Sequence, residues 1–89
     1  MPTVTFTQNI QRHITAPVCS VTGKTVADCL EQVFRSNAGL RGYVLDDQGV
    51  LRRHMAIFVD GRQIDDRVTL GDPVADSGEI FVMQALSGG

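Results

Sequence analysis

The sequence has 89 residues, of which 43% are hydrophobic and 20% are charged, and its formal net charge is −2. That length suits one domain with a modest core, and the composition is typical of an ordinary globular protein. Acidic and basic residues are mixed along the sequence, so we expect no nucleic-acid-binding surface. No apolar run approaches the roughly 20 residues that span a membrane, so we expect no membrane binding. The opening residues do not resemble a signal peptide, so we expect a cytoplasmic protein.

The first predicted elements are two strands that most simply form a hairpin. Val4 and Phe6 alternate with threonines, and this period of two favours a strand. The alternation stops over residues 8–17, which we interpret as a turn or a wide hairpin loop. It resumes in a second predicted strand over residues 18–22.

A helix is predicted next. Thr25 is a suitable N-cap, and Asp28 lies in the first turn, where the helix dipole favours a negative charge. Residues 37–39, Asn-Ala-Gly, supply the C-terminal stop. Apolar residues at helical spacing form one stripe that would pack on a sheet, namely Val26, Cys29, Leu30, Val33 and Phe34.

Residues 40–53 follow the helix and are interpreted as irregular or weakly paired structure. They contain a turn over residues 46–49, where the sequence is Asp-Asp-Gln-Gly. Met55–Val59 is a strong predicted strand. The dipeptide Asp60-Gly61 then predicts a tight hairpin into a short strand over residues 62–64.

The chain closes with connecting structure over residues 65–78, with a short helical turn near Thr69-Leu70, and a last strand over 79–85. This order predicts an α+β fold of the β-grasp (ubiquitin-like) type, a mixed sheet with one main helix packed across one face. We expect one such domain over residues 1–85 and a flexible tail over 86–89. The predicted core is Val4, Phe6, Cys19, Val21, Val26, Cys29, Leu30, Val33, Phe34, Met55, Ile57, Val59, Ile64, Leu70, Ile80 and Val82.

Three large apolar residues are predicted on the sheet face that the helix leaves uncovered: Phe58, Phe81 and Met83. An apolar patch of this kind often marks a partner-binding face. Alternatively, residues 43–53 fold over part of it. Four arginines are equally consistent with polar contacts at the rim of such a face and with a solvated surface, namely Arg52, Arg53, Arg62 and Arg67.

No catalytic site, metal site or bound cofactor is predicted. Cys19 and Cys29 are too few for a metal site or a disulfide framework, and we interpret both as small buried hydrophobic residues. His13 and His54 lack an accompanying nucleophile and acid, so we expect neither to be catalytic.

The most informative segment is the end of the sequence, Leu86-Ser87-Gly88-Gly89. Glycine has no Cβ atom, so a carboxylate at the tip of Gly88-Gly89 could enter a narrow active-site channel of another protein. Two final glycines also arise by chance in roughly one chain in 200 at average glycine usage, and a truncated sequence would give the same ending. How strongly this segment indicates a function therefore depends on the domain that precedes it.

With that domain included, the sequence resembles the bacterial sulfur carriers of the MoaD/ThiS family over essentially its whole length. The family has the ubiquitin-like fold. The chain departs from the family in two places: Asp76-Ser77-Gly78-Glu79 replaces a frequent Gly-Asp pair, and Gln84 stands where proline or a small residue is frequent. The resemblance rests on Val4-Thr5-Phe6, Thr25-Val26-Ala27-Asp28, Ile57-Phe58-Val59-Asp60-Gly61 and Ala85-Leu86-Ser87-Gly88-Gly89.

The resemblance implies chemistry at Gly89. An E1-like adenylyltransferase would use ATP and magnesium to join the Gly89 carboxylate to AMP. A persulfide enzyme, the sulfur donor, would then leave a thiocarboxylate on Gly89, and an acceptor enzyme in cofactor or amino-acid biosynthesis would take the sulfur. The chain itself would be a carrier and co-substrate rather than an enzyme.

Three other functions stay open at this point. The chain could be the small subunit of molybdopterin synthase, whose tail inserts into a larger catalytic subunit. It could be a ubiquitin-like modifier that is conjugated through Gly89 to lysines of target proteins. It could also be an interaction module whose final glycines have no role.

Overall fold

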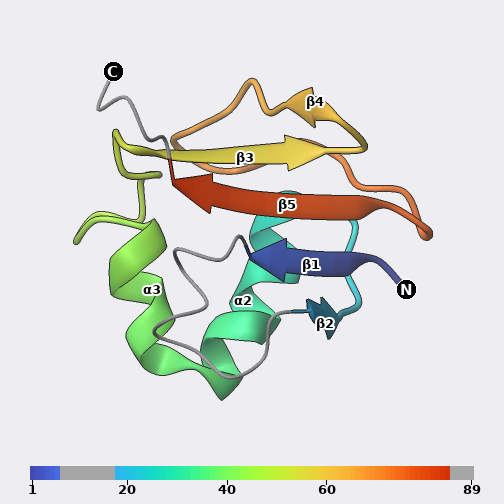
Figure 1. Ribbon diagram of the computed structural model, residues 1–89, viewed down its shortest axis with the longest axis horizontal. Helices are drawn as coiled ribbons and strands as arrows, with labels where there is room; N and C mark the ends of the chain where they lie inside the picture. The colour runs from blue at the N-terminus through green and yellow to red at the C-terminus, as the bar shows by residue number, and fades with distance from the viewer. Residues whose placement is uncertain (7–17, 85–89) are drawn as a thin grey trace.

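The structure is a computed structural model that describes residues 1–6 and 18–84, with the backbone alone at Val18 and Cys19. It has the expected α+β architecture, in which α2 packs across one face of a sheet (Figure 1). The elements in chain order are β1 (Thr3–Phe6), β2 (Val18–Ser20), α2 (Val26–Ser36), α3 (Ala38–Val44), β3 (Met55–Val59), β4 (Arg62–Gln63) and β5 (Glu79–Gln84).

The sheet has the mixed topology of a β-grasp fold. Its strand order is β2-β1-β5-β3-β4, so the first and last strands lie side by side at its centre (Figure 1). Strands β1 and β5 are parallel, whereas β1–β2, β3–β4 and β3–β5 are antiparallel. The predicted hairpin of β1 and β2 is confirmed, although β2 ends at Ser20 rather than at residue 22.

The core lies between the sheet and α2 and contains most of the residues predicted for it. The apolar stripe of α2 is buried, as are Val4 and Phe6 of β1 and Ile80 and Val82 of β5. Val59 is an exception, because it is only partly buried against the core. The side chain of Cys19 lies outside the described residues. The sequence analysis missed five core residues, namely Leu40, Val44, Leu45, Leu51 and Val74.

The N-terminus of α2 is capped as predicted. The Thr25 hydroxyl accepts a hydrogen bond from the backbone N–H of Asp28 at 3.2 Å. Two further N–H groups of the first turn, those of Val26 and Ala27, donate to carbonyl oxygens of the segment before β5, at 3.0 and 2.9 Å. Since the first N–H groups of a helix have no partner inside the helix, these bonds attach that segment to α2.

The prediction of irregular structure from residue 40 onward was wrong at its start, because α3 spans Ala38–Val44. Leu40 and Val44, one helical turn apart, are both buried in the core. Arg41 ties α3 to α2: its Nη2 atom lies 2.6 Å from a carboxylate oxygen of Glu31, and its guanidinium lies 5.4 Å from the ring centroid of Phe34. Packing against the core and against α2 therefore stabilises a helix that the local sequence did not indicate.

Two of the predicted turns of the second half are confirmed, whereas the predicted helical turn near Thr69-Leu70 is not helical, since Leu70 has a positive φ of 57°. Asp60 and Gly61 have positive φ angles of 51° and 84°, which is the conformation of a type I′ hairpin turn between β3 and β4. The turn over residues 46–49 is closed by a bridge between Leu45 and Leu51. Strand β4 ends at Gln63, one residue earlier than predicted.

The last predicted strand is confirmed as β5 up to Gln84, and Ala85 lies outside the described residues. In the part of the chain that the structure describes, neither helix has the length and apolar character needed to cross a membrane.

Candidate functional site at the end of β5

The site begins where the last strand leaves the sheet. Strand β5 pairs with β1 on one side and with β3 on the other, and its final residue, Gln84, is opposite Met55 at the start of β3. The predicted tail residues, Leu86, Ser87, Gly88 and Gly89, lie outside the described residues. The structure places the residue that precedes them, Gln84, at the end of the sheet where β3 begins.

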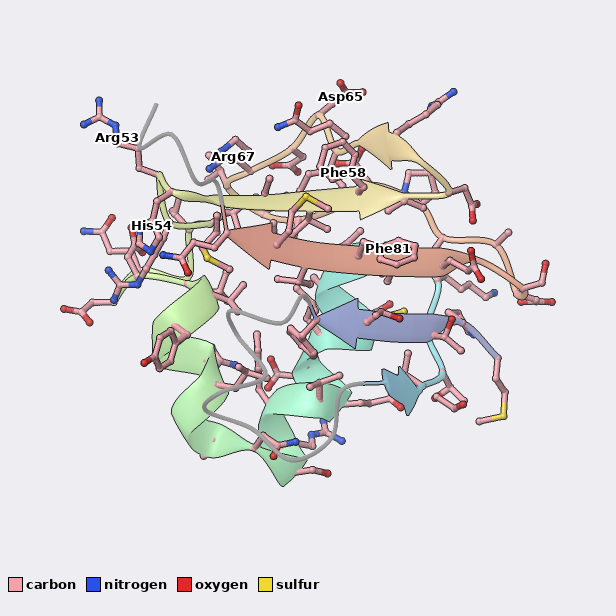
Figure 2. The ribbon with its side chains drawn as sticks, viewed as in Figure 1. Arg53, His54, Phe58, Asp65, Arg67 and Phe81 are labelled. Carbon is pink, nitrogen blue, oxygen red and sulfur yellow. The ribbon has the colours of Figure 1, made fainter. Side chains whose placement is uncertain are left out.

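A tight turn lies beside this point. The backbone N–H of Met55 donates to the carbonyl oxygen of Arg52 at 3.0 Å, which places Arg53 and His54 at the two corners of the turn. Both residues are exposed. Figure 2 shows their side chains at the end of the sheet where β3 starts and β5 stops.

Two arginines hold the turn in place. Arg67 comes from the segment after β4, and its Nη2 donates to the carbonyl oxygens of Arg52 and Met55 at 2.8 and 2.9 Å. Arg52 in turn donates from Nε to the carbonyl oxygen of Gly42 in α3, at 2.7 Å. Each bond joins a charged donor to a backbone carbonyl, which is stronger than a bond between neutral groups. The turn is thus attached to α3 and to the segment that follows β4.

These four residues, Arg52, Arg53, His54 and Arg67, line one surface hollow, and we call them the exit cluster. Asp46 lines the same hollow, but its Oδ1 accepts the backbone N–H groups of Gln48 and Val50. Among the described residues, no member of the exit cluster has a carboxylate within ion-pair distance. With three arginines and one carboxylate, that of Asp46, the hollow has an excess of positive charge in a protein whose net charge is negative.

The sequence analysis named Arg52, Arg53 and Arg67 as possible rim contacts together with Arg62, and it did not associate His54 with them. The structure gathers Arg52, Arg53 and Arg67, whereas Arg62 pairs with Val59 at the opposite end of β3. His54 was considered only as a catalytic group and belongs instead to this turn. One signal was available: Arg52, Arg53 and His54 directly precede a strand whose antiparallel partner leads into the final residues.

The uncovered face of the sheet carries the predicted apolar residues. Phe58 pairs directly with Phe81, and Met83 pairs with Ala56, so the three large side chains are neighbours on adjoining strands. All three are half-buried, and Figure 2 shows both phenylalanine rings on the face opposite the helices. The predicted alternation of β5 is confirmed by the burial of Ile80 and Val82.

Three apolar residues of the segment 43–53, namely Val44, Leu45 and Leu51, belong to the core and so do not cover that face. The role of Phe58, Phe81 and Met83 in binding a partner stays a prediction.

The cysteine whose side chain the structure describes, Cys29, is a core residue. Cys29 is fully buried, and burial together with the negative charge of Asp28 raises the pKa of its thiol. A thiol with a raised pKa is a poor nucleophile at neutral pH. His13 lies outside the described residues. Over residues 1–6 and 18–84, no group of three or more His, Cys, Asp or Glu side chains could hold a metal ion.

Solved structures of other proteins share this fold. A chain of the BexX/CysO complex of Amycolatopsis orientalis superposes with a TM-score of 0.85 at 20% identity, covering 100% of both chains. The small archaeal modifier protein SAMP1 of Methanosarcina acetivorans gives 0.84 at 21% identity, covering 99% of this chain and 95% of that one. CysO of Mycobacterium tuberculosis gives 0.82 at 19% identity, covering 97% and 100%.

No protein-family model matches the sequence, and no curated protein matches it either. The likeness to solved structures thus confirms the ubiquitin-like fold that the resemblance to MoaD/ThiS proteins implies, and at these identities it concerns the fold alone.

Proposed function

We propose that this chain is a sulfur carrier, whose Gly89 carboxylate is adenylated by an E1-like enzyme and then converted to a thiocarboxylate. The observation that carries the proposal is the position of β5. This strand is held between two neighbours at the centre of the sheet, and its last residue immediately precedes Ala85-Leu86-Ser87-Gly88-Gly89. A body of this form presents the segment after Gln84 at a defined place on its surface.

The chemistry needs an activation step because a carboxylate is a poor electrophile. The Gly89 carboxylate attacks ATP on the partner adenylyltransferase, where magnesium is bound, and forms an acyl adenylate with release of pyrophosphate. The terminal sulfur of a persulfide then attacks the acyl carbon, and AMP leaves. A thiol cleaves the resulting acyl disulfide, which frees the thiocarboxylate and oxidises the thiol to a disulfide.

The contribution of this chain to these steps is to position Gly89, and the reactive groups belong to its partners. Cys29 is buried in the core, so it is not suited to act as the persulfide sulfur. The Gly88-Gly89 dipeptide has no Cβ atoms and offers the least steric bulk to a narrow channel. The structural likeness to CysO supports a carrier of this kind, and the sulfur acceptor would be an enzyme of cofactor or amino-acid biosynthesis.

A second candidate is a protein modifier that forms an amide bond between Gly89 and a lysine amine of a target. The likeness to a small archaeal modifier protein favours it. Both candidates begin with the same acyl adenylate, and they differ in the nucleophile that displaces AMP. The small-subunit function in molybdopterin synthase would use the thiocarboxylate formed by the first candidate.

The test is the intact mass of the protein after incubation with the E1-like adenylyltransferase of the same organism, ATP, magnesium and a persulfide donor. Exchange of one oxygen for sulfur at Gly89, dependent on ATP, is the result expected of the carrier. Conjugates at lysines of other proteins would identify the modifier instead. An unchanged mass under all these conditions would contradict both.

Deletion of Gly89 supplies the matched control for this experiment. We expect the deletion to abolish the ATP-dependent mass change and to leave the melting temperature nearly unchanged, because the described core ends with Val82. Loss of the fold on deletion would show that Gly89 has a structural role.

A further inference from the structure

We propose that the exit cluster binds carboxylates at the rim of the active-site channel of the adenylyltransferase, an inference that rests on the proposed function. The pairing of these charges would guide the segment after Gln84 into the channel. The occupant is an acidic protein surface on the adenylyltransferase. The proposal depends on the position of the exit cluster, on its arginines without ion pairs and on the number of residues between Gln84 and Gly89.

The position follows from the strand register. Met55 and Gln84 are paired, so the turn that carries Arg53 and His54 adjoins the last described residue of β5. A partner that receives the residues after Gln84 must therefore approach this turn. Arg62, by contrast, lies beyond Val59, four residues further along β3, or about 13 Å away at the usual rise of a strand.

Within the described residues, the three arginines of the cluster form no ion pair, and the single carboxylate in the same hollow, that of Asp46, offsets only part of their charge. The described ion pair joins Arg41 to Glu31, away from the exit cluster. Arg52 and Arg67 donate to backbone carbonyls, which leaves their positive charge uncancelled. A guanidinium presents several N–H donors in a planar fork that matches a carboxylate, so this surface is suited to bind one.

The cluster is also held rigidly at its base. Arg67 bonds to both ends of the turn, and the backbone N–H of Leu51 donates to the carbonyl oxygen of Arg67 at 2.9 Å. Arg53 and His54 therefore project from a fixed backbone. Because this backbone is already positioned, less backbone conformational entropy is lost when the cluster binds a partner.

The number of residues between Gln84 and Gly89 favours a carboxylate of the partner over a nucleotide phosphate as the ligand. The residues after Gln84 can extend about 17 Å at the usual reach of about 3.4 Å per residue. In a channel they would be extended, so the adenylate on Gly89 would be far from the exit cluster. The groups that meet Arg53 and His54 are then those of the channel mouth, which belong to the partner protein.

The experiment measures the association rate constant with the E1-like adenylyltransferase of the same organism, at low and at high ionic strength. The variants are Arg53→Glu, the neutral Arg53→Gln, and the matched control Arg62→Glu, which makes the same charge change at the other end of β3. A circular dichroism melt of each variant checks its fold. The kcat of adenylation is measured at saturating carrier concentration.

We expect Arg53→Glu to slow association by roughly three- to tenfold at low salt, with a smaller loss at high salt and an unchanged kcat, since rim charges act mainly on the rate of encounter. Arg53→Gln should fall between wild type and Arg53→Glu, and Arg62→Glu should stay within about twofold of wild type, because exposed charges act over about 10 Å.

Three results would overturn the inference, and they are distinguishable. If the wild type is adenylated but Arg53→Glu and Arg62→Glu behave alike, the exit cluster has no special role and the proposed function stands. If the wild type is not adenylated at all, the proposed function fails and the inference fails with it. The third result is saturable binding of free AMP to the isolated chain, if this binding is lost in Arg53→Gln. It would show that the cluster binds phosphate, and it would also overturn the inference.

Discussion

Phe58 on β3 and Phe81 on β5 are direct cross-strand partners on the sheet face that carries no helix (Figure 2). Thr5 of β1 continues the same row beyond Phe81, and Gln63 of β4 continues it beyond Phe58. A pair of aromatic rings at this spacing stabilises a sheet by roughly 0.2–1 kcal/mol. The rings nevertheless remain partly exposed, so part of their apolar area is available to a partner.

The first prediction concerns this pair. Phe81→Asp should weaken binding to the adenylyltransferase by about tenfold or more, because it places a charge in the centre of the apolar patch. The domain should stay folded, with a lower melting temperature. Ala75→Asp adds the same charge at an exposed position before β5 and should have little effect on binding. Equal affinities for both variants, measured by titration calorimetry, would exclude this face from the interface.

The second prediction tests the helix that the sequence did not indicate. Gly39→Ala should stabilise the domain by about 0.5–1 kcal/mol, because alanine favours a helix and a Cβ at this position meets no atom within 4 Å. Gly49→Ala is the matched control, since its Cβ would also meet open space but its φ of +81° disfavours alanine. Chemical denaturation of both variants should give changes of opposite sign. A destabilised Gly39→Ala would contradict the helical assignment of α3.

The third prediction concerns pH. Asp66 accepts the hydroxyl and the backbone N–H of Thr69 together with the N–H groups of Gly71 and Val68, and these bonds lower the pKa of its carboxyl to about 2. A lowered pKa in the folded state means that the carboxylate stabilises the fold above the unfolded pKa of about 4. This contribution is lost as the pH falls through about 2.

Asp66→Asn should therefore destabilise the domain at neutral pH, and its difference from the wild type should shrink between about pH 4 and pH 2. Thermal melts across this range are the measurement. Asp65→Asn is the control, because its exposed side chain accepts none of these N–H groups. A difference between Asp66→Asn and wild type that does not change with pH would mean that the carboxylate charge does not matter.

The fourth prediction concerns Cys29. Burial raises the pKa of its thiol, and the neighbouring charge of Asp28 raises it further. Iodoacetamide at neutral pH should therefore leave Cys29 unmodified in the folded protein and alkylate it once a denaturant is added. Peptide mass mapping distinguishes the two cysteines. Rapid alkylation of Cys29 in the native protein would show that α2 opens from the sheet.

The sequence predicted those parts of the fold that are encoded within a few neighbouring residues. Thr25 followed by the apolar stripe is enough to define α2, and Asp60-Gly61 is enough to define the β3–β4 turn. In α3, by contrast, Gly39 and Gly42 lower the helix propensity, and two apolar positions are too few to establish a period. That helix forms because Leu40 and Val44 enter a core built by distant elements.

In the candidate site, too, only the features encoded within a few neighbouring residues could be predicted from the sequence. The alternation within β5 assigned Phe81 and Met83 to one face from local sequence alone. The exit cluster depends instead on the register of Met55 with Gln84 and on Arg67, which arrives from beyond β4. Neither relationship is local, so the arginines could be named from the sequence but could not be brought together.

The central place of β5 also bears on how the protein is made. Strand β1 is synthesised first and β5 last among the described strands, yet they are direct neighbours, with Thr3 beside Glu79 and Phe6 beside Val82. Until β5 emerges from the ribosome, β1 and β3 have no strand between them and the sheet cannot close. Incomplete chains would consequently lack both the assembled sheet and the residues that follow it, so only a fully translated and folded molecule would be a substrate for the proposed adenylyltransferase.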